Sequence, residues 1–414
     1  MNTGRPDILD MATRPASTAP GMGHGPSPHD AVAKGCSGRP PRPAWIEINM
    51  ARWRGNLQLI QREMPKGLRW MSVVKDEAYG HGSLPAARLA VENGVYSLGV
   101  ATLEEAMKLR EGGIRSRILM LGDRQVEELP WCVAHDLTCC VSEPHVLDQL
   151  AQLASRAGKQ LPVHVKINTG MNRYGVHWNA AWPLVQTILD SPSLRLEGVL
   201  SHFAQSDETD KTFARLQMSR FRDVLTGMES RGISPGLRHL CNSGGYLDLP
   251  EAHFDLVRMG ILPLGVFPSV VCRRLSGISP VMTVKARVVA IQCLAPGDCV
   301  GYGMRYVARA SRRIAVLPLG YGDGYPRVRN KGSVLIRGHR APVVGGVAMD
   351  AVTVDITDVP GATLGDEAVL MGRQGSQEIT AHEVAEVKGS ASYDVLCGWR
   401  GRLPRVYLGE DQQA

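Results

Sequence analysis

The segment 73–82, Val-Val-Lys-Asp-Glu-Ala-Tyr-Gly-His-Gly, places Lys75 directly before a glycine-rich turn. The apolar residues that precede it predict a buried strand, so Lys75 is expected at the carboxyl end of that strand. Partial desolvation lowers the pKa of a lysine in such a position and allows it to form a Schiff base with a carbonyl compound. An isolated lysine at a strand end is more often solvated, so this interpretation needs support from other residues.

Four further polar clusters follow apolar runs in the same way, at 166–173, 201–204, 241–245 and 257–261. Each joins a charged or amide side chain to small residues that allow the backbone to approach a ligand. In an α/β barrel the carboxyl ends of the strands meet on one face, where active sites lie. Solvated strand ends would account for one or two such clusters but not for five. We therefore expect these clusters to form one active site.

The hydrophobic pattern shows the elements that must position these clusters. Residues 44–274 alternate short apolar runs with amphipathic segments such as Leu103–Arg110 and Thr212–Glu229. Nearly continuous apolar strands are typical of sheets covered by helices, so this region predicts repeated βα units in a barrel or a doubly wound sheet. After about residue 275 the apolar runs are short and separated by Gly, Pro and Asp, with one candidate helix at Ala381–Lys388. That pattern predicts a mainly β domain at 275–414.

Composition excludes several other classes of protein. The 414 residues are 44% hydrophobic and 21% charged, which indicates a globular chain rather than a disordered one. The net charge is +7, and the charged residues are interspersed, without the stacking aromatics of a nucleic-acid-binding surface. No run approaches the roughly 20 apolar residues of a membrane span.

The nine cysteines form no CxxC pair, which favours a reducing compartment and gives no reason to expect a metal. Residues 1–43 are rich in Pro and Gly and predict a flexible extension rather than a signal peptide.

These motifs resemble those of alanine racemases, which are pyridoxal-phosphate enzymes. Besides 73–82, the resemblance rests on Thr-Gly-Met-x-Arg-x-Gly at 169–175, Val-Arg-x-Gly-Ile at 257–261, Gly-Tyr-Gly at 301–303, Leu-Gly-Tyr-x-Asp-Gly-Tyr at 319–325 and Ala-Met-Asp at 348–350. It extends from about residue 44 to residue 408. It implies an eight-stranded α/β barrel at 44–274, followed by a mainly β domain at 275–414. A first short strand at 44–49 would join the β domain, which explains why nine apolar runs precede residue 275.

The resemblance also implies which residues perform the chemistry. Lys75 would hold pyridoxal 5'-phosphate and then serve as one of two bases at the substrate Cα. Tyr302, from the β domain, would be the second base on the opposite face, with His202 and Arg258 as catalytic support. A phenol has an unperturbed pKa near 10, so it needs cationic or hydrogen-bonding neighbours to act near neutral pH. Arg258 would also donate to the pyridine nitrogen without protonating it.

Further residues are assigned to binding by the same resemblance. The substrate carboxylate would meet Arg173 and the backbone N–H of Met349, and Tyr321 would line the entrance. Lys166 matches a lysine that some family members carry as a carbamate, with an unmodified lysine as the alternative. The cofactor would be held, besides Lys75, by Tyr79, Asn242, Ser243, Arg258, Gly260, Ile261 and Tyr393.

The resemblance implies a cytoplasmic alanine racemase that supplies D-alanine for peptidoglycan and works as a homodimer with shared active sites. The nearest alternative is a broader amino-acid or serine racemase, but such enzymes tend to lack counterparts of Lys166 and Asp350. A decarboxylase of the same fold and a cofactor carrier made of a barrel alone are two further alternatives. Asp76 and Glu77 depart from the usual residues after the lysine. These acids would either raise the pKa of Lys75 or face solvent.

Overall fold

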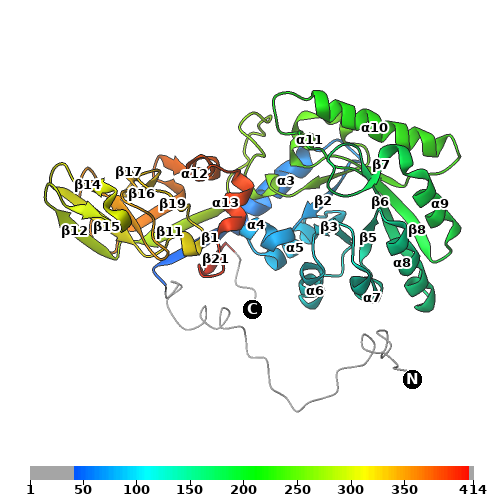
Figure 1. The fold of residues 1–414 in the computed structure, drawn as a ribbon, viewed down its shortest axis with the longest axis horizontal. Coiled ribbons are helices and arrows are strands. Elements are labelled where there is room, and N and C mark those ends of the chain that lie inside the picture. Colours follow the sequence, from blue (N-terminus) through cyan, green and yellow to red (C-terminus); the bar gives the residue numbers. More distant parts are fainter. Residues whose placement is uncertain (1–41, 410–414) are drawn as a thin grey trace, which may run out of the picture.

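The computed structural model describes residues 42–409, so the predicted extension at 1–43 lies outside the described residues except for its last two positions. Figure 1 shows two lobes side by side, a barrel lobe of strands surrounded by helices and a β lobe with few helices. The helix α13 (Ser392–Gly398) belongs to the end of the chain but packs between the lobes, against the turn α4 (Lys75–Gly80). The last part of the sequence therefore lies beside the predicted lysine motif.

The barrel lobe is a parallel sheet with the strand order β10–β2–β3–β4–β5–β6–β8–β9. The strands are β2 (Arg69–Val73), β3 (Ser97–Val100), β4 (Ile118–Met120), β5 (Thr138–Val141), β6 (Leu161–Asn168), β8 (Leu194–Leu200), β9 (Leu237–His239) and β10 (Leu256–Met259). A two-residue strand, β7 (Val176–His177), extends β6. Between β9 and β10, Arg258 N donates to Cys241 O at 3.0 Å, so the barrel is nearly closed.

Helices cover the outside of this sheet (Figure 1). They are α3 (Met50–Glu63), α5 (Ser83–Glu92), α6 (Leu103–Glu111), α7 (Leu129–Ala134), α8 (Pro144–Arg156), α9 (Trp182–Asp190), α10 (Thr212–Glu229) and the short α11 (Ser243–Asp248). The first turn of α6 shows why such segments become helices: Thr102 caps it and Glu105 bonds back to the cap, while Ala106 and Leu109 are buried on the inner face. The sequence predictions for α6 and α10 agree with the structure.

The β lobe contains one large sheet with the order β17–β16–β19–β11–β1–β21, in which β20 (Gln377–Ile379) pairs with β19. Its strands are β1 (Ala44–Asn49), β11 (Met282–Arg287), β16 (Ser333–Ile336), β17 (His339–Pro342), β19 (Glu367–Gln374) and β21 (Arg405–Leu408). A smaller sheet joins β12 (Ala290–Leu294), β15 (Arg312–Leu317) and β18 (Val352–Asp355), and β13 (Cys299–Val300) pairs with β14 (Tyr306–Val307). The helix α12 covers Ala381–Lys388, as predicted.

The predicted fold class, an eight-stranded α/β barrel followed by a mainly β domain, is confirmed. The first strand, β1, pairs antiparallel with β11 and parallel with β21, so it joins the β lobe as expected. Two apolar runs of the β lobe do not form single continuous strands. The run 281–291 is divided between β11 and β12, because the chain passes from one sheet to the other. The run 341–348 is strand only to Pro342, and Val343, Val344 and Val347 are buried in irregular structure.

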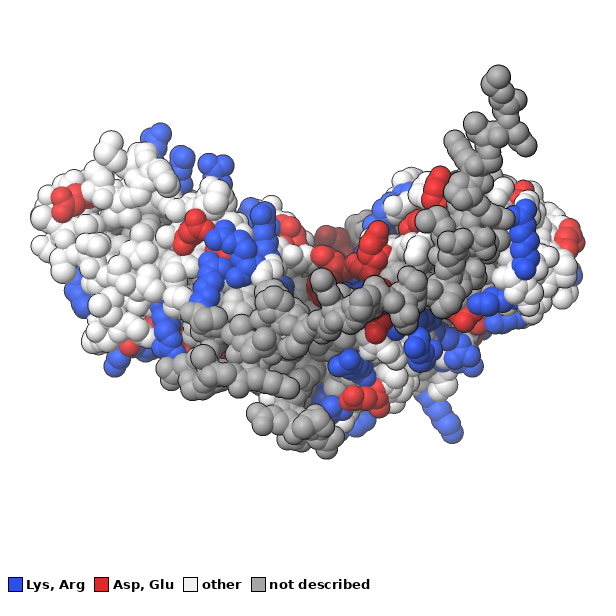
Figure 2. All heavy atoms as spheres, turned by 90° about the horizontal axis from the view of Figure 1, so that it is seen from below, with Lys and Arg blue, Asp and Glu red and all other residues white. Residues whose placement is uncertain are grey.

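The interior of the barrel is filled with side chains, which confines any ligand to its ends. Met71, Leu119, Cys140, Leu200, Leu237 and Leu256 form a buried cluster inside it. On the face shown in Figure 2 the surface is hollowed between the lobes, and both lobes carry charges of both signs. Within residues 42–409 no helix is long and apolar enough to cross a membrane.

Candidate active site

A cavity of about 300 Å³ lies at the carboxyl end of the barrel strands. Eleven of the site residues expected from the sequence line it: Lys75, Tyr79, Lys166, Arg173, His202, Asn242, Ser243, Arg258, Gly260, Ile261 and Tyr393. The structure thus brings together the five clusters that follow different strands. The other lining residues are Val73, Leu121, Leu200, Phe203, Ala204 and Asp207, of which Leu121, Leu200 and Asp207 lie outside the five clusters.

The backbone after Lys75 adopts an unusual conformation. The strand β2 ends at Val73, and the four residues 76–79 all have left-handed dihedral angles, with φ between 50° and 54°. Such angles cost an L-residue roughly 1–2 kcal/mol each, so neighbouring segments must hold the turn. Asp76 N donates to Glu105 Oε1 at 2.6 Å, and Arg405 Nε donates to Gly80 O at 2.6 Å. The sequence predicted a turn here, but only these long-range contacts account for its left-handed form.

Of the two acids that follow Lys75, Glu77 is bonded through its carboxylate to helix α6 and its surroundings, whereas Asp76 contacts Glu105 of that helix through its backbone N–H. Glu77 accepts a hydrogen bond from Lys108 Nζ at 2.5 Å and another from Ser83 N at 3.2 Å. Partial burial opposes ionisation of this carboxyl, but the bonds from Lys108 and Ser83 prevail and lower the pKa of Glu77. The negative charge of Glu77 is therefore balanced by Lys108, and the hydrogen bonds to its carboxylate hold the turn.

Arg258 is the most extensively bonded side chain of the cavity. Its Nη2 donates to Ser201 O at 2.7 Å and to His202 Nδ1 at 2.9 Å, and its Nη1 donates to His239 O at 3.0 Å. Burial lowers the pKa of Arg258 to about 10, so it stays protonated at neutral pH. Burial and the neighbouring Arg258 hold the pKa of His202 well below its usual range. His202 is therefore neutral, and Arg258 keeps Nε as the donor left for a ligand.

A buried chain of hydrogen bonds leads from Arg258 through the barrel. Arg258 Nη1 donates to His239 Nδ1 at 3.0 Å, His239 Nε2 lies 2.8 Å from His164 Nδ1, and His164 Nε2 lies 3.2 Å from Glu197 Oε2. Because arginine only donates, every bond in the chain points toward Glu197. Burial lowers the pKa of both histidines, which keeps them neutral. The carboxylate of Glu197 is thus linked to the charge of Arg258.

Sequence reasoning missed this chain. His164 and His239 do lie in predicted strands, β6 and β9, but nothing in their spacing shows that they meet. The pairing of β8 with both of these strands brings the histidines together.

Lys166 lies near the end of β6, and Arg173 lies in the loop that follows this strand. Lys166 is 6% exposed, donates to Leu121 O at 3.3 Å and lies 5.2 Å from the centre of the Tyr174 ring. Burial lowers its pKa. Arg173 is exposed at the edge of the cavity. Asn168 holds the loop between them, because its Oδ1 accepts hydrogen bonds from Gly170 N and Asn172 N at 3.0 and 3.1 Å.

The opposite side of the cavity is a cradle of small and hydroxyl-bearing residues. Asn242 caps helix α11 by accepting from Gly245 N at 2.9 Å, and Ser243 Oγ accepts from Gly260 N at 3.3 Å. A Cβ at Gly260 would lie 2.3 Å from Tyr79 Oη, so only glycine leaves room here. The rings of Tyr79 and Tyr393 are 6.1 Å apart.

Of the four expected site residues that follow residue 275, Tyr393 lines this cavity, whereas Tyr302, Tyr321 and Met349 do not. Tyr302 is 79% exposed and Met349 is 51% exposed. Tyr321 lies beside Met349, because Tyr321 N donates to Ala348 O at 3.0 Å. The turn that carries Tyr321 is fixed by the fully buried Asp323, whose carboxylate is held by Arg42 at 2.7 and 2.9 Å.

Comparison with known proteins assigns this arrangement to a family. The family model described as alanine racemase, N-terminal domain, matches residues 48–268, and that described as alanine racemase, C-terminal domain, matches residues 281–407. An alanine racemase of Syntrophobacter fumaroxidans is 41% identical over 88% of this chain and 98% of its own length. The chain belongs to the alanine racemase family.

Solved structures agree with this assignment. Alanine racemase from Streptomyces coelicolor has a TM-score of 0.84 at 36% identity, covering 89% of this chain and 98% of its own. Alanine racemase from Clostridium difficile has a TM-score of 0.84 at 30% identity, covering 89% and 97%. A histidine racemase from Leuconostoc mesenteroides is also similar, with a TM-score of 0.81 at 28% identity over 89% of this chain and 99% of its own. The scaffold thus serves more than one amino-acid racemase.

Alanine racemases are isomerases that depend on pyridoxal 5'-phosphate, and the cavity of this family member fits that cofactor. Burial raises the pKa of Tyr79 and Tyr393, so both phenols remain protonated donors. Together with the Ser243 hydroxyl and the backbone at Gly260, they form a donor set suited to a phosphate. Lys75 supplies an amine in the same cavity. Within residues 42–409 no cluster of His, Cys, Asp and Glu could hold a metal ion.

Proposed function

We propose that this protein interconverts L-alanine and D-alanine by a two-base mechanism with pyridoxal 5'-phosphate. The observation that carries the proposal is the cavity at the end of the barrel, which gathers Lys75, the buried Arg258 and the hydroxyl cradle around Gly260. We assign the D-alanine to peptidoglycan synthesis and the protein to the cytoplasm. We also take residues 44–274 as the cofactor-binding barrel, with 44–49 packed on the β domain, and residues 275–414 as that β domain.

In this proposal Lys75 binds the cofactor and then moves the proton at the substrate Cα on one face. The bound cofactor withdraws electrons from that carbon and makes its proton acidic. The left-handed turn after Lys75 fixes the backbone from which the amine extends. Tyr302 is the base on the other face, because inversion requires delivery of a proton from the side opposite to its removal.

Arg258 would bind the pyridine nitrogen of the cofactor. The two terminal nitrogens of Arg258 donate to His202, His239 and backbone carbonyls, so its Nε is the donor that remains available for the cofactor. An arginine with a pKa of about 10 donates a hydrogen bond but does not readily deliver a proton. Arg258 would thereby leave that nitrogen without an added proton, which would limit charge delocalisation and side reactions.

The substrate carboxylate would meet Arg173 and the backbone N–H of Met349, with Tyr321 at the entrance. We propose that Lys166 carries a carbamate that orients Arg173. The lowered pKa of Lys166 supports this assignment, because a neutral amine is the form that adds carbon dioxide. Asn242, Ser243, Gly260, Ile261, Tyr79 and Tyr393 would hold the phosphate.

A complete site in this proposal requires two chains. Tyr302 and Met349 are exposed on the β lobe and do not line the cavity of their own barrel. We infer a head-to-tail homodimer in which these residues reach the barrel of the partner subunit. Exposure of an apolar methionine and a tyrosine on one lobe supports this arrangement.

A substrate panel tests the proposed specificity. The purified protein is incubated separately with L-alanine, L-serine, L-histidine, L-lysine and L-arginine, and formation of each D-enantiomer is followed by chiral chromatography. We expect alanine to have the highest kcat/KM and serine to react slowly, since one added hydroxyl is a weak discriminator. The histidine racemase on the same scaffold makes broader specificity the second candidate. Comparable kcat/KM for histidine, lysine or arginine would favour that candidate.

The cofactor assignment has a separate test. The purified protein should absorb in the visible range of a lysine-bound pyridoxal group, and borohydride reduction should fix the cofactor covalently. Peptide mapping should place the label on Lys75. A label on another lysine would contradict the assignment of Lys75, and Lys166 in the same cavity serves as the internal control.

A further inference from the structure

The ammonium group of Lys211 is enclosed by three acceptors near the cradle. Lys211 lies in the loop between β8 and α10, and its Nζ donates to Ser206 O at 2.7 Å, Glu208 O at 2.5 Å and Asp248 Oδ2 at 2.8 Å. A lysine has three N–H donors, so each of them is used. The side chains of Lys211 and Asp248 are only 13% and 11% exposed. The pair therefore differs from ordinary surface ion pairs, which contribute little.

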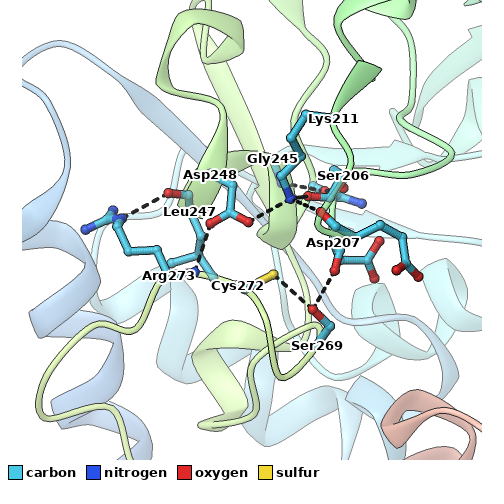
Figure 3. A network of polar contacts seen from close by, with 11 residues as sticks. Ser206, Asp207, Lys211, Gly245, Leu247, Asp248, Ser269, Cys272 and Arg273 are labelled. Carbon is cyan, nitrogen blue, oxygen red and sulfur yellow. Dashed lines mark hydrogen bonds and ion pairs between the residues drawn. The ribbon is translucent and has the colours of Figure 1, made fainter. Parts of the chain in front are cut away.

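Asp248 connects this pair to the segment that leads toward the β lobe. Its second carboxylate oxygen, Oδ1, accepts from Arg273 N at 2.9 Å, and Arg273 Nε donates to Leu247 O at 2.9 Å. In the same segment Ser269 Oγ donates to Asp207 O at 2.5 Å. Figure 3 shows how the loop 206–211, the end of helix α11 and the segment 269–273 converge on this network.

The loop held by Lys211 is in direct contact with the phosphate side of the cavity. Ser206 is fully buried, and its Oγ donates to Asn242 Oδ1 at 2.8 Å. A Cβ at Gly244 would lie 3.0 Å from Ser206 Oγ and 3.2 Å from the Cβ of Asp207. Loop and helix are thus packed without a gap. Since Asp207 and Asn242 both line the cavity, any shift of the loop changes its shape.

We propose that the Lys211–Asp248 pair positions the phosphate cradle and thereby sets the affinity for the cofactor. The inference rests on the proposed function, because it takes Asn242 and Ser243 as phosphate ligands. Removal of one partner leaves a buried charge uncompensated, so the loop separates from helix α11 and Asn242 loses its support. Lys75 and Arg258 follow other strands, and Arg258 keeps its own hydrogen bonds. Lys211 and Asp248 are positioning residues, and their loss affects binding of the cofactor more than the proton transfer.

The test is a cofactor titration of the full-length apoenzyme, prepared by removal of pyridoxal phosphate with hydroxylamine. Lys211→Met should raise the Kd for pyridoxal phosphate by about tenfold, which corresponds to about 1.4 kcal/mol. At saturating cofactor its kcat should remain close to that of the wild type. Lys159→Met is the control, because Lys159 Nζ makes the same kinds of bond, to Val133 O at 2.7 Å and Asp136 Oδ1 at 2.8 Å, away from the cavity. Its Kd should be unchanged.

A double-mutant cycle separates positioning from general stability. Asp248→Asn should also raise the Kd. The double variant that combines Lys211→Met with Asp248→Asn should lose less binding free energy for the cofactor than the sum of the losses in the two single variants. If Lys211→Met does not fold, Ser206→Ala tests the contact through which the same loop supports Asn242 and should give a smaller increase in Kd. An unchanged Kd in a folded variant, with only its melting temperature lowered as in the Lys159→Met control, would overturn the inference. Failure of the wild type to bind pyridoxal phosphate would instead contradict the proposed function.

Discussion

Three polar residues of the cavity in the barrel lobe are buried and bonded, whereas two residues of the β lobe that are expected to complete the site lie on the surface. Arg258 is 4% exposed, Lys166 is 6% exposed and Ser243 is 3% exposed. Tyr302 and Met349, by contrast, are 79% and 51% exposed. The barrel therefore organises its half of the site within one chain. In the proposed homodimer the β lobe would present Tyr302 and Met349 to the barrel of the second chain.

Substitution of Lys75 tests the part of the active site that the barrel of one chain forms. Lys75→Ala removes both the cofactor attachment and one base, so racemisation should fall by about 10⁴-fold, the upper range for loss of an acid–base group. The measurement is kcat/KM for alanine in both directions. Lys166→Ala in the same cavity should keep a larger fraction of activity. A Lys75→Ala variant that retains substantial activity would contradict the assignment.

Substitution of Tyr302 tests the part of the proposed active site that the β lobe contributes. Tyr302→Phe removes the proposed second base and should lower racemisation by about 10²- to 10³-fold. Because Lys75 remains on one face, the variant should still exchange the Cα hydrogen of one alanine enantiomer with deuterated water. NMR of both enantiomers measures this asymmetry. Equal loss of exchange for both would show that Tyr302 does not serve one face alone.

The two lobes should also respond differently to acid. Burial lowers the pKa of His81 to about 4 and also lowers those of His164, His202 and His239, all in the barrel. Below about pH 6.5 the unfolded chain binds protons that the folded barrel does not, so stability falls as pH falls, by up to about 1.4 kcal/mol per pH unit for each such histidine.

In the β lobe His382 has a lowered pKa but is only half-buried. Hydrogen exchange at pH 5 and pH 7.5, corrected for the intrinsic rate, should therefore show a larger loss of protection in the barrel strands. Equal loss in both lobes would mean that they unfold as one unit.

Mixing two inactive variants tests whether the halves come from different chains. In a dimer of Lys75→Ala with Tyr302→Ala, one site lacks both bases and the other has both. Random mixing makes about half of the dimers mixed, so about a quarter of the wild-type activity should return. The assay follows co-expression at matched protein concentration. Recovery near zero, in preparations that contain mixed dimers, would show that Tyr302 serves the barrel of its own chain.

The smallest expected effect concerns the buried chain behind Arg258. Glu197→Gln removes its negative end while leaving a hydrogen-bond acceptor for His164, so kcat should fall by only about threefold, or about 0.7 kcal/mol. The pH profile of kcat should shift as well, because Arg258 loses the charge to which it is linked. Arg195→Gln is the control, since Arg195 contacts the other oxygen of Glu197 at 3.1 Å. Equal effects of the two changes would indicate a general loss of packing.

The sequence determined the repeated βα pattern, the β domain and most of the cavity residues, because strand ends in a barrel converge by topology alone. It also determined that Lys75 precedes a tight turn. It did not reveal the left-handed dihedrals of residues 76–79, since these depend on contacts with Glu105 and Arg405, which are distant in sequence. The chain of hydrogen bonds through His164 and the ion pair of Lys211 with Asp248 also depend on contacts between residues that are distant in sequence. Such contacts arise only when separate strands and loops pack together, and no local pattern encodes them.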